Sequence, residues 1–118
     1  MSNKVLSIVG PTGVGKSNLA LWLARQCKDL GQSIEIISMD SALVYKGMNI
    51  GTAKPSKAEQ DEVVHHLIDI LDPSQNYSAA QFASDAKELI TDIKLRGNVP
   101  LIVGGTMLYW RAWVYGFS

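Results

Sequence analysis

Short apolar runs alternate along this chain with longer segments in which apolar residues recur at helical spacing. Apolar runs rich in β-branched residues are typical of strands buried on both faces, whereas apolar positions three or four residues apart are typical of one helix face. Two pairs, Ser56 with Glu59 and Ser78 with Gln81, have the spacing of capping boxes, at which helices begin. The pattern predicts strands at 5–9, 34–39 and 99–103, and helices at 16–30, from 56 to His65 or His66, at 78–97 and between Gly105 and Gly116.

This alternation of strands and helices predicts an α/β fold with one parallel sheet, right-handed crossovers and helices on both faces. In such folds, ligands bind beyond the carboxyl ends of the strands. Here those ends are followed by residues 10–17, 40–45 and 104–106. We therefore expect three segments that are distant in sequence to form one crevice.

The segment after the first strand reads GPTGVGKS and matches the P-loop pattern G-x-x-x-x-G-K-[ST]. Its glycines let backbone N–H groups converge on phosphate oxygens, while the helix N-terminus and a lysine add positive charge. A glycine-rich turn with a solvated lysine is the alternative, but pattern and context both favour the P-loop. The prediction is a P-loop NTPase-like, three-layer fold that binds a diphosphate or triphosphate, with Ser17 able to ligate Mg²⁺. The binding residues would be Gly10, Pro11, Thr12, Gly13, Val14, Gly15, Lys16 and Ser17.

Polar residues also follow the other two strands. Asp40 ends the second strand, where it could hold magnesium indirectly through a metal-bound group, act as a general base or cap the following turn. Thr106 follows two glycines after the third strand, where its hydroxyl could donate to a phosphate oxygen or cap the next helix. The adjacent residues His65 and His66 would diverge on a helix and make a poor metal site, so we expect both to be structural.

The amino-acid composition says less than the motifs about which molecules this protein binds. Eleven basic residues balance eleven acidic ones in 118 residues, so the total charge indicates neither a nucleic acid nor a membrane surface as partner. The single cysteine, Cys27, excludes an internal disulfide and is typical of a reducing cytoplasm. The opening apolar run is too short for a signal peptide or a membrane span, so we expect one cytoplasmic domain without a membrane partner.

Four segments resemble one known family: GPTGVGKSNLA, IISMDSALVYKGMNIGTAKPS, HHLIDILDPSQNYSAAQF and VPLIVGGTMLYWRAWVYG. Together they resemble the N-terminal part of bacterial tRNA dimethylallyltransferases, also called tRNA isopentenyltransferases, over nearly the whole chain. P-loops occur in many unrelated proteins, whereas DSALVYKG, DPSQNYSA and GGTMLY in this order are specific to that family and its adenylate-prenylating relatives. The resemblance implies that residues 1–118 are the P-loop catalytic core, the N-terminal portion of a longer, monomeric enzyme.

The resemblance also implies a reaction, in which a dimethylallyl group passes from dimethylallyl diphosphate to N6 of adenosine 37 in tRNAs that read codons beginning with U. Residues 12–17 would hold the diphosphate, with Mg²⁺ on Ser17 and with Lys16 supporting the departure of pyrophosphate. Asp40 would take the N6 proton, and Thr106 would contact the substrate near the reacting centre. The adenine, extruded from the anticodon loop, would contact Asp40, Ser41, Ala42, Leu43 and Thr106.

Three other functions fit parts of the same pattern. An adenylate prenyltransferase would use the same donor on free AMP, ADP or ATP, although DSALVYKG and PSQNYSA favour the tRNA class. A P-loop kinase would transfer the γ-phosphoryl group of ATP, but no segment indicates its acceptor. A nucleotide-binding module without catalysis is the third, and the absence of D-x-x-G and N-K-x-D motifs argues against a GTPase switch.

Overall fold

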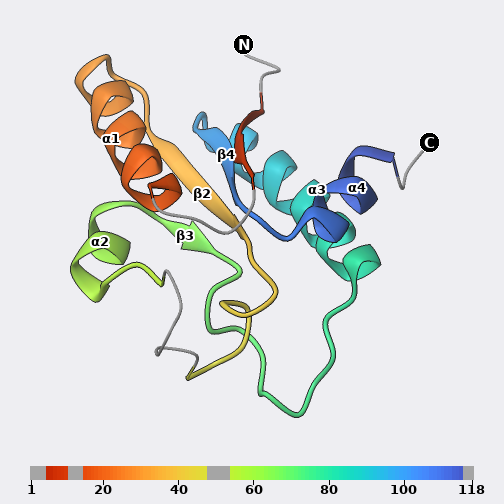
Figure 1. Ribbon diagram of the computed structural model, residues 1–118. Helices are drawn as coiled ribbons and strands as arrows, with labels where there is room; N and C mark the ends of the chain where they lie inside the picture. Colours follow the sequence, from red (N-terminus) through yellow and green to blue (C-terminus); the bar gives the residue numbers. More distant parts are fainter. Residues whose placement is uncertain (1–4, 11–14, 48–53, 116–118) are drawn as a thin grey trace.

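The computed structural model describes residues 5–10, 15–47 and 54–115, and their helices and strands form three layers (Figure 1). A parallel sheet lies between α1 on one face and α3 with α4 on the other. In chain order, the described elements are β1 (Leu6–Val9), α1 (Lys16–Asp29), β2 (Ile34–Met39), α2 (Lys57–Glu62), β3 (His65–His66), α3 (Ala79–Leu95), β4 (Val99–Gly104) and α4 (Met107–Tyr115). The predicted α/β, three-layer architecture is confirmed.

β4 lies inside the sheet although it is the last described strand in sequence. The strand order is β1-β4-β2-β3, and each described pairing is parallel. Val9 of β1 and Met39 of β2 lie opposite Gly104 of β4, one on each side. The last residues of three strands are therefore neighbours, and the segments that follow them start from one edge of the sheet.

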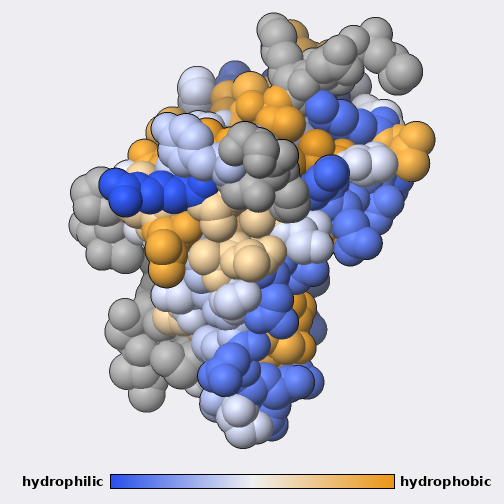
Figure 2. All heavy atoms as spheres, turned by 90° about the vertical axis from the view of Figure 1, so that its right-hand side faces the viewer, coloured by the Kyte–Doolittle hydropathy of each residue, from blue (hydrophilic) through white to orange (hydrophobic). Residues whose placement is uncertain are grey.

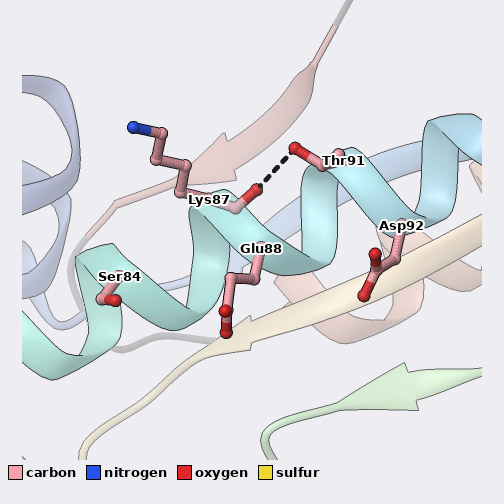
Figure 3. A pocket seen from close by; sticks show the side chains of 5 residues that line it. All are labelled: Ser84, Lys87, Glu88, Thr91 and Asp92. Carbon is pink, nitrogen blue, oxygen red and sulfur yellow. Dashed lines mark hydrogen bonds between the residues drawn. The ribbon is translucent and has the colours of Figure 1, made fainter.

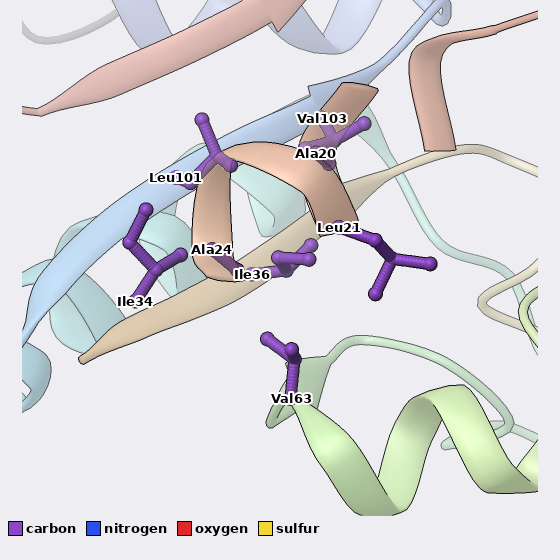
Figure 4. Packing of buried hydrophobic residues seen from close by; sticks show 8 residues of the cluster. All are labelled: Ala20, Leu21, Ala24, Ile34, Ile36, Val63, Leu101 and Val103. Atoms are coloured by element: carbon purple, nitrogen blue, oxygen red, sulfur yellow. The ribbon is translucent and has the colours of Figure 1, made fainter. Parts of the chain in front are cut away.

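Side-chain alternation along β2 and β4 divides the core into two clusters. Ile36 and Leu101 face α1, whereas Ile37 and Ile102 face α3 and α4. Burying one such aliphatic side chain stabilises the fold by roughly 1.5–3 kcal/mol. Each helix therefore covers the face of the sheet whose apolar side chains it buries. Figure 4 shows the cluster under α1, which consists of Ala20, Leu21, Ala24, Ile34, Ile36, Val63, Leu101 and Val103.

Both predicted capping boxes are confirmed. The Ser56 and Ser78 side chains each accept a hydrogen bond from the backbone N–H three residues later, at 3.1 Å in both cases. In return, the side chains of Glu59 and Gln81 accept from the N–H of the capping serine, at 2.8 and 2.7 Å. These reciprocal bonds satisfy N–H groups that the first helical turn cannot, which explains why α2 and α3 begin where the sequence predicts.

The predicted end of the second helix is wrong, because His65 and His66 lie on strand β3. α2 ends at Glu62, and Val63 already has extended backbone angles. β3 pairs with β2 in parallel, and the His66 ring contacts the Glu35 carboxylate, with 2.7 Å between Nε2 and Oε1. Pairing with the sheet and this contact between distant residues override the local helical pattern.

Glu35 is a carboxylate buried within the sheet and surrounded by hydrogen-bond donors. Only 4% of the residue is exposed. Arg96 donates to it from Nε and Nη2 at 2.9 and 2.7 Å, and Asn98 donates from Nδ2 at 2.8 Å. The hydrogen bonds from Arg96, more than any other cause, lower the pKa of Glu35 to about 2 despite the opposing effect of burial. The carboxylate thus ties β2 to the end of α3 and to the turn before β4.

The side of the molecule that carries α3 and α4 has both polar and apolar groups on its surface. Figure 2 shows apolar groups that interrupt the polar surface there. Leu108 and Tyr115 on α4 are each 68% exposed, and Leu95 at the end of α3 is 81% exposed. Even so, the helices in the described part of the chain are too short or too polar to cross a membrane.

Candidate functional site

The P-loop segment is described at its two ends. Gly10 follows β1, and Gly15 leads into α1 with a φ of 104°, a left-handed conformation that glycine adopts without strain. Residues between these glycines that the sequence assigns to phosphate binding lie outside the described residues: Pro11, Thr12, Gly13 and Val14. The structure therefore places the entry and the exit of the predicted loop.

The N-terminus of α1 has the features of an anion site. No side chain caps the helix at Gly15, and no acidic residue lies in its first turn. Lys16 and Ser17, both half-buried, begin the helix. Helix N-termini carry partial positive charge and present N–H groups that have no partner within the helix, so they bind phosphate readily.

Asp40 caps the turn that follows β2. Its Oδ1 atom accepts hydrogen bonds from the backbone N–H groups of Ala42, at 2.7 Å, and Leu43, at 3.1 Å. Of the three roles that the sequence left open for Asp40, the geometry shows the cap. Both bonds end on Oδ1, so the cap is compatible with a further role for Oδ2.

Thr106 connects the end of β4 to the segment after β2. Its Oγ1 atom accepts a hydrogen bond from the Ser41 backbone N–H at 3.0 Å and lies 3.5 Å from the Ser41 hydroxyl oxygen. The Thr106 carbonyl accepts from the N–H groups of Tyr109 and Trp110 in the first turn of α4. Thr106 therefore places the start of α4 beside Asp40 and Ser41.

Gly104 lets β2 and β4 end in close contact. A Cβ atom at this position would lie 2.0 Å from the Met39 carbonyl oxygen, well inside van der Waals contact. Backbone hydrogen bonds join the strand ends here: Gly10 donates to the Gly104 carbonyl at 3.4 Å, and Thr106 donates to the Met39 carbonyl at 3.3 Å. The predicted convergence of the three segments is confirmed for their described residues.

The segment after Asp40 is held by the chain that follows β3. Asp69 donates its backbone N–H to the Leu43 carbonyl at 2.9 Å, and Ile70 donates to the Val44 carbonyl at 3.0 Å. Leu43 and Val44 are themselves buried. Asp69 also forms an ion pair with Lys54. These contacts fix the backbone of the segment that begins with Asp40 and Ser41.

An aromatic cluster formed by Tyr77, Phe82 and Tyr109 joins α4 to α3 and to the segment before α3. The Tyr109 hydroxyl donates to the Tyr77 carbonyl at 3.0 Å, and the Tyr109 ring stacks on Phe82 with ring centroids 5.2 Å apart. The Tyr77 hydroxyl donates to Asp85 at 2.5 Å. Burial, aided at Tyr77 by Asp85, raises the pKa of both phenols, so each remains a donor at neutral pH. The hydroxyl bond of Tyr109 could not be predicted from the sequence, because its partner lies 32 residues away and leaves no local pattern.

A family model described as IPP transferase matches residues 43–118, which include β4 and α4. The chain belongs to the IPP transferase family. The match confirms the resemblance that the four sequence segments indicated.

Curated and solved relatives of this IPP transferase family member bear related names. A tRNA dimethylallyltransferase of Polynucleobacter necessarius is 65% identical over 114 residues, which are 97% of this chain and 34% of that protein. The full-length tRNA isopentenylpyrophosphate transferase of Bacillus halodurans superposes with a TM-score of 0.85 at 50% identity, over 99% of this chain and 37% of that one. A eukaryotic dimethylallyltransferase acting on tRNA gives a TM-score of 0.82 at 38% identity, over 93% and 26%. The chain thus spans about a third of the length of the curated relatives it matches.

A depression on the surface of this IPP transferase family member is a poor candidate for the site. It lies on the outer face of α3, where Figure 3 shows the Thr91 hydroxyl donating to the Lys87 carbonyl at 3.2 Å. Its lining residues, Ser84, Lys87, Glu88, Thr91 and Asp92, all belong to this one helix. They recur at the spacing of a solvent-exposed helix face, and among the residues that the structure describes no group from another element lines the depression.

Magnesium is compatible with the residues at the start of α1. Within the described ranges, no three His, Cys, Asp or Glu side chains gather into a metal site. Ser17 offers one hydroxyl oxygen beside the anion-binding end of the helix. Because Mg²⁺ commonly combines one or two protein oxygens with phosphate oxygens and water, a single serine fits a metal that arrives with a diphosphate.

Proposed function

We propose that this chain is the catalytic core of a tRNA dimethylallyltransferase, which transfers a dimethylallyl group from dimethylallyl diphosphate to N6 of adenosine 37 in tRNAs that read codons beginning with U. One observation carries the proposal. The hydrogen bond between Ser41 and Thr106 brings a carboxylate, Asp40, to the strand edge from which the P-loop also starts. The names of the curated relatives support the same activity.

The donor diphosphate would bind at the N-terminus of α1. Backbone N–H groups of residues 12–17 would surround its oxygens, and the Lys16 ammonium would balance the charge that develops on the departing pyrophosphate. Mg²⁺, held by Ser17 and the diphosphate, would supply further charge neutralisation. P-loops are usually described as ATP-binding. Here the same loop would instead bind an isoprenoid diphosphate, whose phosphate groups offer it the same oxygens.

The acceptor adenine would approach Asp40. Oδ2 would accept a hydrogen bond from the N6 amine and take its proton, while Oδ1 keeps its bonds to Ala42 and Leu43. As the nitrogen forms a bond to C1 of the allyl group, the bond from C1 to the diphosphate oxygen breaks and pyrophosphate leaves with that electron pair. Ser41 and Thr106, already joined to each other, would contact the substrate at this point.

Recognition would require the adenine to leave its stack in the anticodon loop, because a base inside a stacked loop cannot reach the strand edge. With a tRNA substrate, the full-length enzyme would act in the cytoplasm, and we propose that it acts there as a monomer. The proposed tRNA and dimethylallyl diphosphate partners are those of a full-length enzyme. This chain corresponds to about a third of the length of such an enzyme.

Calorimetric titration of the chain tests donor binding. Dimethylallyl thiodiphosphate and ATP are titrated separately with Mg²⁺, and Lys16→Ala serves as the site control. Tighter binding of the isoprenoid analogue, lost in the control, supports the proposal. Tighter binding of ATP, lost in the same control, favours the kinase alternative.

Transfer is tested on a chimera that joins this chain to the remaining part of the Polynucleobacter necessarius relative, called the full-length chimera below. It is given allyl-labelled donor with either tRNA or AMP. Label on N6 of adenosine 37 supports the proposed acceptor. Label on AMP alone would identify an adenylate prenyltransferase, and label on neither would contradict both.

A further inference from the structure

The segment after β3, residues 67–71, contains two unusual backbone conformations. Leu67 has a φ of 68° and Asp69 a φ of 56°, and in the described part of the chain they are the only residues other than glycine in the left-handed region. A side chain as bulky as that of leucine crowds the backbone there, whereas aspartate is tolerated better. Such strained residues persist only where neighbouring contacts hold them, and they are common beside functional sites.

The contacts of residues 67–71 hold the segment after β2, residues 40–46. The Asp69 N–H donates to the Leu43 carbonyl at 2.9 Å, and the Lys46 N–H donates to the Leu71 carbonyl at 2.8 Å. These bonds reach both the middle and the end of residues 40–46. The backbone of the segment after β3 therefore determines where the segment after β2 lies.

The Asp69 side chain is held on one oxygen and left without a partner on the other. Its Oδ2 atom pairs with the Lys54 ammonium, and the two side chains are 35% and 17% exposed. Its Oδ1 atom is buried and accepts no hydrogen bond from the residues that the structure describes. Because a buried oxygen without a donor costs free energy, stability alone does not explain an aspartate at this position.

We propose that Asp69 is a positioning residue for the acceptor. Its left-handed backbone and its ion pair with Lys54 hold residues 40–46 so that the Asp40 carboxylate stays beside Thr106. This inference rests on the proposed function, because it requires Asp40 to receive the acceptor amine. Asp69 acts through the backbone and does not touch the reacting atoms. Since the P-loop starts from a different strand, β1, donor binding should not depend on Asp69.

Two substitutions of Asp69 separate its backbone from its charge. Asp69→Ala loses both features, because alanine disfavours the left-handed region and has no carboxylate. Asp69→Asn loses the charge alone, because asparagine is tolerated in that region. Asp72→Asn is the matched control, since Asp72 is an exposed carboxylate nearby whose Oδ1 accepts from Ser74 within its own turn.

The three variants are made in the full-length chimera, and transfer to tRNA is measured per donor-binding site. We expect kcat to fall at least about tenfold for Asp69→Ala and about threefold for Asp69→Asn. Affinity for dimethylallyl thiodiphosphate, and the number of sites found by calorimetry, should stay within about twofold throughout. An unchanged kcat in Asp69→Ala, or an equal loss in Asp72→Asn, would overturn the proposal. A lack of transfer by the unaltered chimera would instead contradict the proposed function.

A double-mutant cycle tests the ion pair. Lys54→Gln should slow transfer about as much as Asp69→Asn, and the two substitutions together should cost no more than either alone, because both remove the same interaction. A combined loss equal to the product of the single losses would show that Lys54 and Asp69 act independently, and would overturn the part assigned to their pairing.

Hydrogen exchange of the 118-residue chain tests the positioning without any assay of transfer. In Asp69→Ala the Lys46 and Leu71 amides, which join the two segments, should exchange at least about tenfold faster, while the Leu101 and Ile102 amides of β4 keep their rates. Should alanine accelerate exchange in β4 as well, Asp69→Asn is compared in its place, with faster exchange again expected at Lys46 and Leu71 alone. Unchanged exchange at these two amides in both variants would overturn the proposal, whatever the activity of the chimera.

Discussion

The backbone N–H of Ser41 donates to the Thr106 hydroxyl at 3.0 Å, although the two residues are 65 positions apart in sequence. The bond joins the segment after β2 to the residue before α4, and so links Asp40 to the end of the central strand. Neither residue belongs to the P-loop motif. In the proposed reaction, the acceptor would meet the donor beside this bond.

Replacing Thr106 with valine should slow transfer while leaving the fold intact. Valine has nearly the same shape but cannot accept the Ser41 N–H, which is exposed and can bond water instead. In the full-length chimera we expect kcat to fall roughly tenfold, which corresponds to about 1.4 kcal/mol. Thr106→Ser, which keeps the hydroxyl, should restore most of the rate, and a rate for Thr106→Val equal to that of the unaltered chimera would contradict the assigned role.

Replacing Lys16 with alanine should weaken binding of dimethylallyl thiodiphosphate by roughly tenfold to a hundredfold, as is typical when a hydrogen bond to a charged group is lost. Isothermal calorimetry on the 118-residue chain measures the change. Lys28→Ala is the matched control, because Lys28 lies in the last turn of the same helix, far from the P-loop. Equal losses in both variants would indicate a general charge effect.

Replacing Asp40 with asparagine should separate catalysis from structure. An asparagine side-chain oxygen can still accept from Ala42 and Leu43, so the turn is retained, but the amide cannot take a proton. We expect kcat of the full-length chimera to fall by about 10²–10⁴, the usual contribution of a general base. Affinity for the donor analogue should stay within about twofold, and a parallel loss of donor binding would point to a magnesium ligand instead.

The buried carboxylate of Glu35 should make stability depend on acid pH. Its pKa of about 2 in the folded protein lies below the ordinary 4.5, so the ionised form stabilises the fold above about pH 4.5, and this stabilisation is lost as the pH falls towards 2. The difference corresponds to about 3 kcal/mol. Urea unfolding of Glu35→Gln should show most of this loss at pH 7 and much less at pH 3. Glu62→Gln, which alters an exposed carboxylate, should change stability little at either pH.

Replacing Gly104 with alanine should disrupt the site edge of the sheet. The new methyl group would collide with the Met39 carbonyl, which is backbone and cannot rotate away. We expect a loss of at least about 3 kcal/mol in the free energy of unfolding, measured by urea titration, or failure to fold. Gly10→Ala is the control, because a Cβ atom there meets nothing within 4 Å. A stable Gly104→Ala variant would show that β2 and β4 can separate at this edge without cost.

Local patterns in the sequence determined the elements and indicated the proposed chemistry. Apolar runs located β2 and β4, capping boxes located the starts of α2 and α3, and the P-loop motif located the phosphate end of α1, because each depends on residues close together in the chain. The alternation of strands with helices also implied that the strand ends meet. The family resemblance followed from the order of these same segments.

Only the tertiary structure decided how distant residues pair. His65 and His66 became a strand because β2 offered hydrogen bonds and Glu35 offered a partner, and a lone glutamate in an apolar strand was the one local sign of that cluster. The position of β4 between β1 and β2 placed Thr106 against Ser41. Strand order and hydrogen bonds between remote residues depend on packing of the whole chain, for which no short stretch of sequence carries the information.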